Sequence, residues 1–277
     1  MDSGSPGEFR GCRLAYRVEG SGPPVVLIQG VGIHGQGWSP QVLALRERFT
    51  CLTFDNRGMG ASQPIGDRIT VPQMAEDALW LMSRLGWDSA HVVGHSLGGP
   101  VALEMALTHP ERVRSLSLLC TLARGRDATR LTRRMLWLGI RSRVGTRRMR
   151  RRAFLRIVMP ADALAGADED AMAAELAPLF GHDLADQPPV AMKQLAALRA
   201  YDATDRLGEI RGIPTLVLSA AHDPIAPPAR GRALAGGIEG ARYVEFADAS
   251  HGLPIQHPAE VNGLLMDHLS SAESIIT

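Results

Sequence analysis

The feature that most constrains this chain is a short apolar run that changes into a helix through two glycines around a serine. Residues 90–93 have the apolar, β-branched character of a buried strand, and residues 100–106 have the pattern of a helix start. Between them lies Gly94-His95-Ser96-Leu97-Gly98, a match to G-x-S-x-G. So abrupt a change of direction requires positive φ at the middle residue and leaves no room for side chains at positions 94 and 98.

Ser96 is therefore predicted to lie at the tip of a sharp turn with its hydroxyl exposed. The N-terminus of the following helix favours negative charge that develops beside the serine. A serine in this position is a candidate nucleophile, and the alternative is a plain glycine turn without chemistry. The strand before the motif and the helix after it favour the nucleophile.

Length and composition indicate one large α/β domain. A chain of 277 residues, 45% of them hydrophobic, can bury the core of such a domain and still hold an inserted subdomain. The formal net charge is only +1, so no general attraction to nucleic acid or to a membrane surface is expected.

The cysteines and the apolar runs favour a cytoplasmic location. Cys12, Cys51 and Cys120 are odd in number and widely spaced, so we expect reduced thiols without metal-ligand spacing. The polar start at residues 1–8 has no apolar core of a signal peptide. No apolar run is long enough to span a bilayer.

Strand-like and helix-like segments alternate along most of the chain. This alternation predicts the α/β class, with a mostly parallel central sheet flanked by helices. Residues 1–121 and 199–277 are expected to form this core domain, with an edge strand or hairpin over 9–18. Buried strands are expected at 25–28, 51–55, 90–93, 113–119, 215–218 and 242–246, and helices at 40–48, 71–85, 100–106, 230–235 and 258–269.

One block, residues 122–198, breaks the alternation because it has helical patterns and no convincing strand. As an insertion between two core strands, it is predicted to form a helical lid. Its charge is divided: residues 124–156 contain 13 arginines and one acid, whereas residues 162–186 contain seven acids and no lysine or arginine. Either the two halves pair with each other and face solvent, or part of the basic face receives an anionic substrate, a carrier protein or coenzyme A.

A serine hydroxyl becomes a good nucleophile only when a base removes its proton and a carboxylate holds that base in one tautomer. Asp223 and His251 each follow an expected strand. Both therefore lie at the carboxyl edge of the sheet, where Ser96 lies and where open parallel sheets bind ligands. We predict His251 as the base and Asp223 as its carboxylate. Asp248 is the alternative acid, but a carboxylate so close in sequence would have to fold back to reach the imidazole.

The oxyanion that develops during attack on a carbonyl requires hydrogen-bond donors near Ser96. The backbone N–H of Leu97, directly after the serine, is one expected donor. The other is the backbone N–H of Val31, in the glycine-rich loop after the strand at 25–28. The glycines on either side of Val31 allow this loop to approach the substrate closely.

Five motifs occur in a characteristic order: Gln29-Gly30-Val31-Gly32, Asp55-Asn56-Arg57-Gly58-Met59-Gly60-Ala61-Ser62, Gly94-His95-Ser96-Leu97-Gly98-Gly99, Asp223 and Ser250-His251-Gly252. Together they resemble the α/β-hydrolase superfamily, and within it the branch of small cytoplasmic esterases, lactonases and C–C hydrolases. The arrangement is similar to 3-oxoadipate enol-lactonases. The resemblance covers nearly the whole chain outside the insertion, and it implies an α/β-hydrolase fold with a catalytic triad.

The chain departs from this family at Gln29, where the family usually has a histidine before the glycine. The resemblance implies that the family's histidine supports the loop, so Gln29 either bonds the same neighbours or reaches the substrate. His34 either faces the pocket or is an exposed loop histidine. Trp38, Trp137 and Leu253 are candidate pocket walls, with core packing as the alternative.

The sequence predicts a serine hydrolase that cleaves a carboxylic ester or lactone through an acyl-enzyme on Ser96. No metal or organic cofactor is implied, and P-loop and dinucleotide fingerprints are absent from the sequence. The expected partner is a small-molecule substrate, anionic or carrier-bound under the second interpretation of the insertion. The alternatives use the same triad for thioester or C–C bond hydrolysis, or for decarboxylation or cyclisation. A ligand-binding receptor without turnover is disfavoured, because a binder does not need a triad.

Overall fold

The computed structural model describes residues 7–64, 68–129 and 133–276, and a sheet of seven strands forms its centre. The strands lie in the order β3-β5-β4-β6-β7-β8-β9. All neighbours are parallel except β3 and β5, which pair antiparallel at one edge. The bounds are β3 Tyr16–Gly20, β4 Pro24–Ile28, β5 Thr50–Phe54, β6 Ala90–His95, β7 Val113–Leu119, β8 Thr215–Ala220 and β9 Arg242–Phe246.

The first strands of the chain form the predicted hairpin. β1 (Gly7–Phe9) pairs with β2 (Cys12–Leu14) outside the main sheet, and β3 follows as the edge strand. The polar start at residues 1–6 lies outside the described residues. The mostly parallel sheet predicted from the alternation of segments is confirmed.

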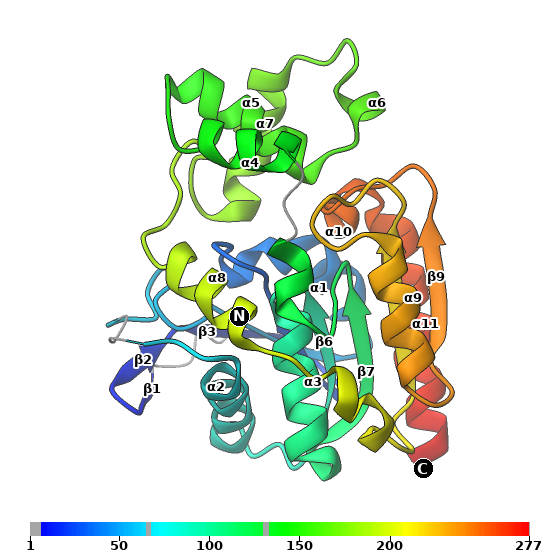
Figure 1. Ribbon diagram of the computed structural model, residues 1–277. Helices are drawn as coiled ribbons and strands as arrows, with labels where there is room; N and C mark the ends of the chain where they lie inside the picture. Colours follow the sequence, from blue (N-terminus) through cyan, green and yellow to red (C-terminus); the bar gives the residue numbers. More distant parts are fainter. Residues whose placement is uncertain (1–6, 65–67, 130–132, 277) are drawn as a thin grey trace.

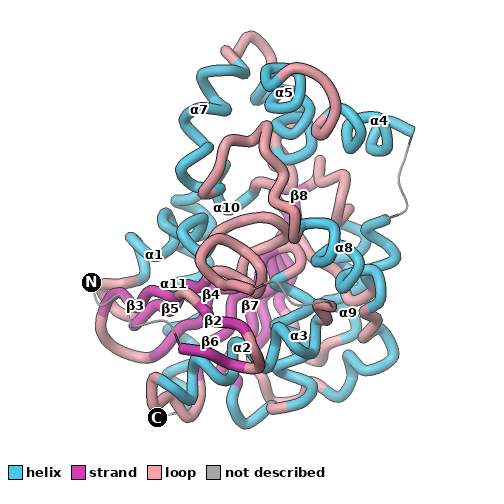
Figure 2. Tube along the Cα trace, turned by 90° about the vertical axis from the view of Figure 1, so that its left-hand side faces the viewer, coloured by secondary structure: helices cyan, strands magenta, loops and turns pink. Residues whose placement is uncertain are grey.

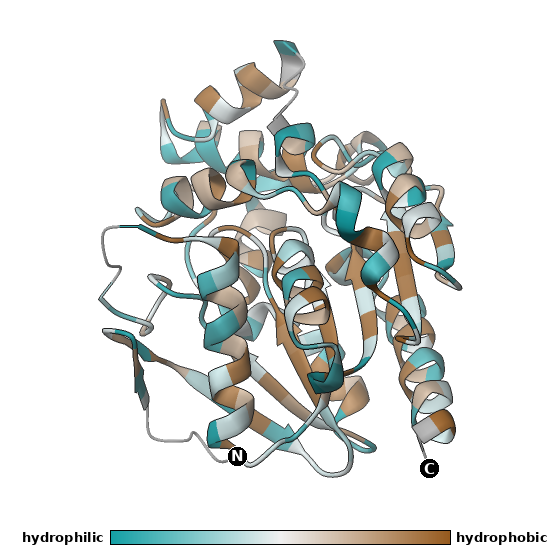
Figure 3. Ribbon diagram, turned by 60° about the horizontal axis from the view of Figure 1, so that its bottom comes forward, coloured by the Kyte–Doolittle hydropathy of each residue, from teal (hydrophilic) through white to brown (hydrophobic). Residues whose placement is uncertain are grey.

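Helices cover both faces of the sheet (Figure 1). One face packs against α2, α3 and α9, and the other packs against α1 and α11. Apolar residues are concentrated on the strands between these two layers (Figure 3). No described helix combines the length and apolar character that crossing a bilayer requires. The bounds are η1 Gly35–Trp38, α1 Ser39–Leu45, α2 Val71–Arg84, α3 Gly98–Thr108, η2 Pro110–Arg112, η4 Thr204–Glu209, α9 Pro228–Gly237, α10 Leu253–Gln256 and α11 Pro258–Ile276.

Helix α2 shows how local sequence sets the ends of these elements. The Thr70 hydroxyl accepts a hydrogen bond from the Gln73 N–H at 3.2 Å, and Pro72 occupies the first turn, where its missing N–H costs nothing. The helix ends just before Gly86, whose φ of 73° is the left-handed conformation that glycine adopts readily.

Residues 122–198 lie between β7 and β8 and form helices, with no strand among the residues described there. Figure 1 places α4, α5 and α7 beyond the carboxyl ends of the strands, and Figure 2 also shows these helices outside the sheet. Helix α8 runs through the boundary predicted at residue 198 and ends at Ala200. The bounds are η3 Gly125–Thr129, α4 Arg133–Arg141, α5 Arg147–Val158, α6 Ala161–Leu164, α7 Glu169–Phe180 and α8 Ala191–Ala200.

The basic and acidic halves of this insertion bind each other, as the first interpretation of its divided charge predicts. Most of the pairs join α5 to α7 or to the loop after α7, and most of their side chains are partly exposed. Exposed ion pairs contribute little each, so this network orients the helices more than it stabilises them. Arg130 lies outside the described residues. The pairs are Arg147–Asp183, Arg147–Asp186, Arg148–Asp170, Arg151–Asp183, Arg152–Asp170 and Arg156–Glu169.

Candidate active site

The turn between β6 and α3 has the geometry that the G-x-S-x-G pattern predicts. Ser96 has φ of 53°, which is rare for a residue with a side chain. A Cβ on Gly94 would overlap the Gly98 carbonyl, and a Cβ on Gly98 would overlap the Ile28 carbonyl. The Ser96 N–H donates to the Leu119 carbonyl at 3.0 Å. Backbone contacts on several sides therefore hold the serine in its strained conformation.

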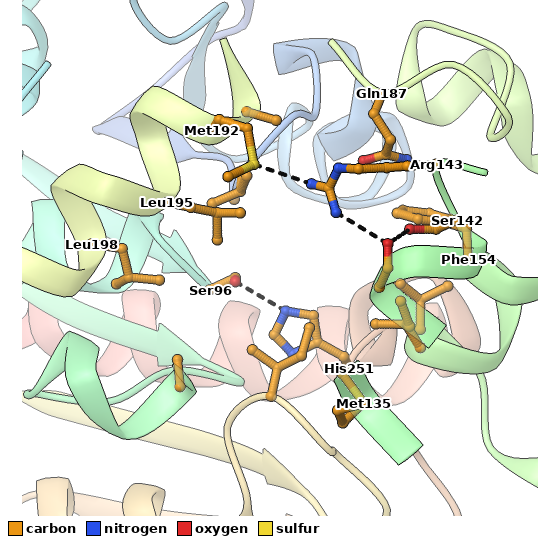
Figure 4. A pocket seen from close by; sticks show the side chains of 18 of the residues that line it. Ser96, Met135, Ser142, Arg143, Phe154, Gln187, Met192, Leu195, Leu198 and His251 are labelled. Carbon is orange, nitrogen blue, oxygen red and sulfur yellow. Dashed lines mark hydrogen bonds between the residues drawn. The ribbon is translucent and has the colours of Figure 1, made fainter. Parts of the chain in front are cut away.

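Ser96, His251 and Asp223 form one hydrogen-bonded chain. The Ser96 hydroxyl lies 2.9 Å from His251 Nε2 (Figure 4). On the other side of the ring, His251 Nδ1 lies 2.8 Å from Asp223 Oδ2. Ser96 follows β6, Asp223 follows β8 and His251 follows β9. The three residues meet because these parallel strands end at one edge of the sheet. The alternative acid Asp248 is 78% exposed and lies 3.4 Å from His257 instead.

Asp223 is nearly fully buried, yet its surroundings favour the ionised form. Burial alone would raise its pKa, but His251 and the backbone N–H groups of Ala226 and Ile225 together outweigh burial and lower the pKa below the usual value. The other carboxylate oxygen accepts the N–H groups of Ile225 and Ala226 at 2.8 and 2.9 Å. An ionised acceptor at Nδ1 places the proton of neutral His251 on that nitrogen, so Nε2 is free to accept the serine proton.

His95 lies beside His251 and supports it. Burial lowers the pKa of His95 to about 3, so its ring is neutral. Its Nε2 lies 2.9 Å from the His251 carbonyl oxygen, an acceptor, and so carries the proton of this hydrogen bond. The Trp38 ring packs edge-on against the His95 ring, with the ring centroids 6.4 Å apart. His95 therefore fixes the backbone of His251 rather than taking part in proton transfer.

Val31 and Leu97 have the free backbone donors that an oxyanion site requires. Within the described part of the chain, neither N–H donates a hydrogen bond. Val31 borders the cavity beside Ser96, and Leu97 directly follows the serine. The next N–H of the loop, that of Gly32, donates to Gln194 Oε1 at 2.9 Å. Gln194 is buried on α8 and holds this loop in place, a role that no sequence motif indicated.

A cavity of about 750 Å³ opens above Ser96 and His251. Its walls are mainly apolar, and most of them come from α4, α5 and α8 of the insertion (Figure 4). Met135, Phe154 and Leu195 are examples from these helices. Arg143, in the turn before α5, lies at the opposite side of this space from the serine (Figure 4). The cavity therefore places the Ser96 hydroxyl at the base of a largely apolar space.

Three of the predicted pocket walls do not border this cavity. Trp38 and Leu253 are fully buried in the core beside α1 and α11, because both side chains pack toward the sheet and away from the loops. Trp137 is 54% exposed and lies against the Arg141 guanidinium, since it is on the outer face of the amphipathic helix α4. These three predictions are wrong.

Gln29 and His34 also lie outside the main cavity. Gln29 is buried behind the site, where its Oε1 accepts the Gly30 N–H at 3.3 Å and its carbonyl accepts the Asn56 side chain at 2.9 Å. It thus supports the loop and does not reach the cavity. His34 lies 3.4 Å from Asp55 at the surface, and its hydrogen bond to this carboxylate raises the histidine's pKa. Its prediction as a pocket residue is wrong.

Metal-ligating side chains do not gather near the site. In the parts of the chain that the structure describes, no three His, Cys, Asp or Glu residues are grouped so that they could hold a metal ion.

The fold and the site geometry define the protein as an α/β-hydrolase, an enzyme class built on such a sheet and such a turn. The family model for the alpha/beta hydrolase fold matches residues 23–258. The chain therefore belongs to the α/β hydrolase fold family, as the sequence motifs indicated.

Similar proteins align with nearly the whole chain. RutD of Azorhizobium caulinodans, provisionally described as a carbamate hydrolase, is 32% identical over 91% of this chain and 93% of its own length. The enol-lactonase of Burkholderia xenovorans LB400 is 29% identical, with a TM-score of 0.79 over 94% of this chain and 98% of that one. A thermophilic esterase of Thermogutta terrifontis is 26% identical, with a TM-score of 0.78 over 94% of each chain.

Proposed function

We propose that the protein is a serine hydrolase that cleaves a carboxylic ester or lactone through an acyl-enzyme on Ser96. The observation that carries this proposal is the unbroken hydrogen-bonded chain from Ser96 through His251 to the buried Asp223, open to an apolar cavity. Such a chain removes one proton from a hydroxyl at neutral pH. The named activities of the structural relatives, an enol-lactonase and an esterase, support the same class of bond.

In the first half-reaction, Ser96 Oγ attacks the carbonyl carbon while its proton moves to His251 Nε2. The ionised Asp223 stabilises the imidazolium that forms. The tetrahedral intermediate then expels the alcohol oxygen, which takes the proton from His251. In a lactone this alcohol stays attached to the acyl group.

In the second half-reaction, His251 removes a proton from water, and the hydroxide attacks the acyl-enzyme carbonyl. The second intermediate collapses, Ser96 regains its proton, and the carboxylic acid leaves. The free N–H groups of Val31 and Leu97 support the proposal, since they can donate to the oxyanion of both intermediates.

In this proposal the insertion at residues 122–198 is the lid of the site. Its helices supply most of the apolar cavity wall, and a dry cavity strengthens hydrogen bonds to the developing charge. The three cysteines are free and buried, which supports the proposed cytoplasmic location.

A fluorophosphonate probe tests the proposal directly. We expect the wild type to gain the mass of one adduct, and Ser96→Ala and His251→Ala to gain none. Ser142→Ala is the matched control, because Ser142 borders the same cavity but, among the described residues, its hydroxyl bonds only the Gly139 carbonyl, at 2.9 Å. It should still be labelled.

Turnover then identifies the bond. Esters and lactones should be hydrolysed in a Ser96-dependent manner and faster than matched thioesters, carbamates and C–C substrates. A folded wild type that acquires no adduct and hydrolyses none of these compounds would overturn the proposal.

A further inference from the structure

A second hollow, of about 250 Å³, adjoins the apolar cavity. The two share four lining residues, so the two spaces lie side by side. We refer to this second space as the basic hollow, because both of its charged residues are arginines. Its residues are Arg143, Arg150, Ala185, Gln187, Pro188, Pro189, Ala191 and Met192.

The two arginines of the basic hollow differ from their neighbours in the insertion. Arg147 and Arg151, on the same helix as Arg150, are both ion-paired to Asp183. Arg143 and Arg150 form no ion pair with any described residue; Arg143 donates to the Gly139 carbonyl at 3.2 Å and contacts the Met192 sulfur at 3.4 Å. The hollow therefore carries positive charge that the acidic half of the insertion does not neutralise.

Two donors at the basic hollow lack acceptors. Arg150 Nε and Gln187 Nε2 are both removed from solvent, and neither donates a hydrogen bond to the described residues. A buried donor without an acceptor is unfavourable. The hollow thus has guanidinium groups and unsatisfied donors but no carboxylate of its own, which is the composition of a site for an anion.

We propose that the basic hollow is an anion subsite that binds a carboxylate or phosphate group of the substrate. The substrate is an amphiphilic ester whose carbonyl lies at Ser96, whose apolar part fills the cavity, and whose anionic end is bound by Arg143 and Arg150. This assignment of substrate class rests on the proposed function of Ser96. Figure 4 shows the required order, with Ser96 and His251 on one side of the space and Arg143 and Gln187 on the other.

A kinetic comparison tests the subsite. The substrates are mono-p-nitrophenyl esters of dicarboxylic acids, from pentanedioic to decanedioic acid, each beside its neutral methyl-capped form. At the length that spans the two spaces, we expect kcat/KM to be about tenfold higher for the anionic ester, as a charge-assisted contact predicts. Added salt should reduce this preference, because the hollow is open to solvent.

Variants locate the anion. Arg143→Gln combined with Arg150→Gln should abolish the preference for the anionic ester, and Arg143→Lys should retain part of it. Arg133→Gln, an exposed arginine of α4 outside both spaces, is the matched control and should keep the preference. Arg199→Gln removes another arginine that borders the apolar cavity. If Arg199→Gln alone abolishes the preference, the anion binds elsewhere and the assignment is wrong.

Binding without turnover separates this inference from the proposed function. Calorimetry with Ser96→Ala protein and two probes, octanedioate and octyl phosphate, should show binding that the Arg143/Arg150 double variant loses. The probe that binds more tightly identifies a carboxylate or a phosphate as the anion. Arginine-dependent binding in an enzyme that cleaves no ester would support the subsite and overturn the function. Ser96-dependent hydrolysis with no anionic preference at any length and no arginine-dependent binding would support the proposed function and overturn the subsite.

Discussion

The turn around Ser96 and the helical insertion border the same cavity, but different forces hold them. At the turn, backbone atoms pass so closely that no side chain fits at Gly94 or Gly98, and Ser96 is held at a φ of 53°. In the insertion, partly exposed ion pairs join α5 to α7, and two small apolar clusters pack α5 against α7 and against α4. The first region leaves almost no room for displacement, whereas many side chains of the second are partly exposed and lie away from the sheet.

This difference suggests a division of tasks. Proton transfer requires distances near 2.9 Å, which only a close-packed framework maintains. Selection among substrates requires a wall of suitable shape and charge, which partly exposed helices can provide. Perturbing the turn should therefore abolish activity or folding, and perturbing the insertion should change specificity or local stability.

The largest effect is expected for Asp223→Asn. The N–H groups of Ile225 and Ala226 will keep the amide oxygen at the position of Oδ1, so the NH2 group will face His251 Nδ1. Nδ1 must then accept, the ring proton moves to Nε2, and the ring can no longer take the serine proton. We expect kcat/KM for a p-nitrophenyl ester to fall by about 10³ to 10⁴, with little change in melting temperature.

Asp248→Asn is the control for this variant, because Asp248 is exposed and remote from His251 Nδ1. It should retain wild-type kcat/KM. A loss of less than tenfold in Asp223→Asn would show that the carboxylate does not set the tautomer.

The next effect compares one glycine from each region. Alanine at Gly98 places a Cβ against the Ile28 carbonyl, and neither backbone can yield, so the free energy of unfolding should fall by about 2 to 3 kcal/mol. Alanine at Gly139 meets nothing within 4 Å on helix α4, so stability should stay the same or rise by up to about 1 kcal/mol. Urea denaturation measures both. Equal losses in the two variants would contradict the contrast between the regions.

The turn could be predicted from sequence because its causes are local. Two glycines, a preceding apolar run and a following helix pattern determine the path of the chain around Ser96. The meeting of Ser96, Asp223 and His251 could also be expected, since parallel strands end at a common edge. The order of the elements and the steric limits at the turn are enough to predict where these residues lie, and neither depends on details of side-chain packing.

The cavity wall could not be predicted in the same way, because it depends on which side of a loop or helix faces inward. Apolar character placed Trp38 and Leu253 somewhere in the interior, but only the folded chain shows that they pack into the core. The pairing of His34 with Asp55 joins residues from two separate loops. Arg143 and Arg150 differ from Arg147 and Arg151 in having no acidic partner among the described residues, which the composition of the segment does not reveal.

The smallest effect is expected in the ion-pair network. Asp183 accepts hydrogen bonds from Arg151, Arg147 and the Ala185 N–H, and the bond to Arg151 contributes most to holding its pKa well below the usual range. A depressed folded pKa means that the stabilisation is present above the unfolded pKa of about 3.9 and is lost as the pH falls toward the folded value. At pH 7 the network is therefore intact, but salt screens it because its side chains are partly exposed.

Asp183→Asn should consequently loosen the insertion at neutral pH without unfolding the protein. We expect faster amide exchange in α5 and α7, no change in β6 and β7, and a smaller difference from wild type in 1 M salt, where the Debye length is about 3 Å. Asp186→Asn is the matched control, because Asp186 is 49% exposed and pairs with Arg147 alone among the residues that the structure describes. Its exchange should stay close to wild type. Faster exchange in β6 after Asp183→Asn would show that the insertion and the sheet form one cooperative unit, and the proposed division of tasks would not hold.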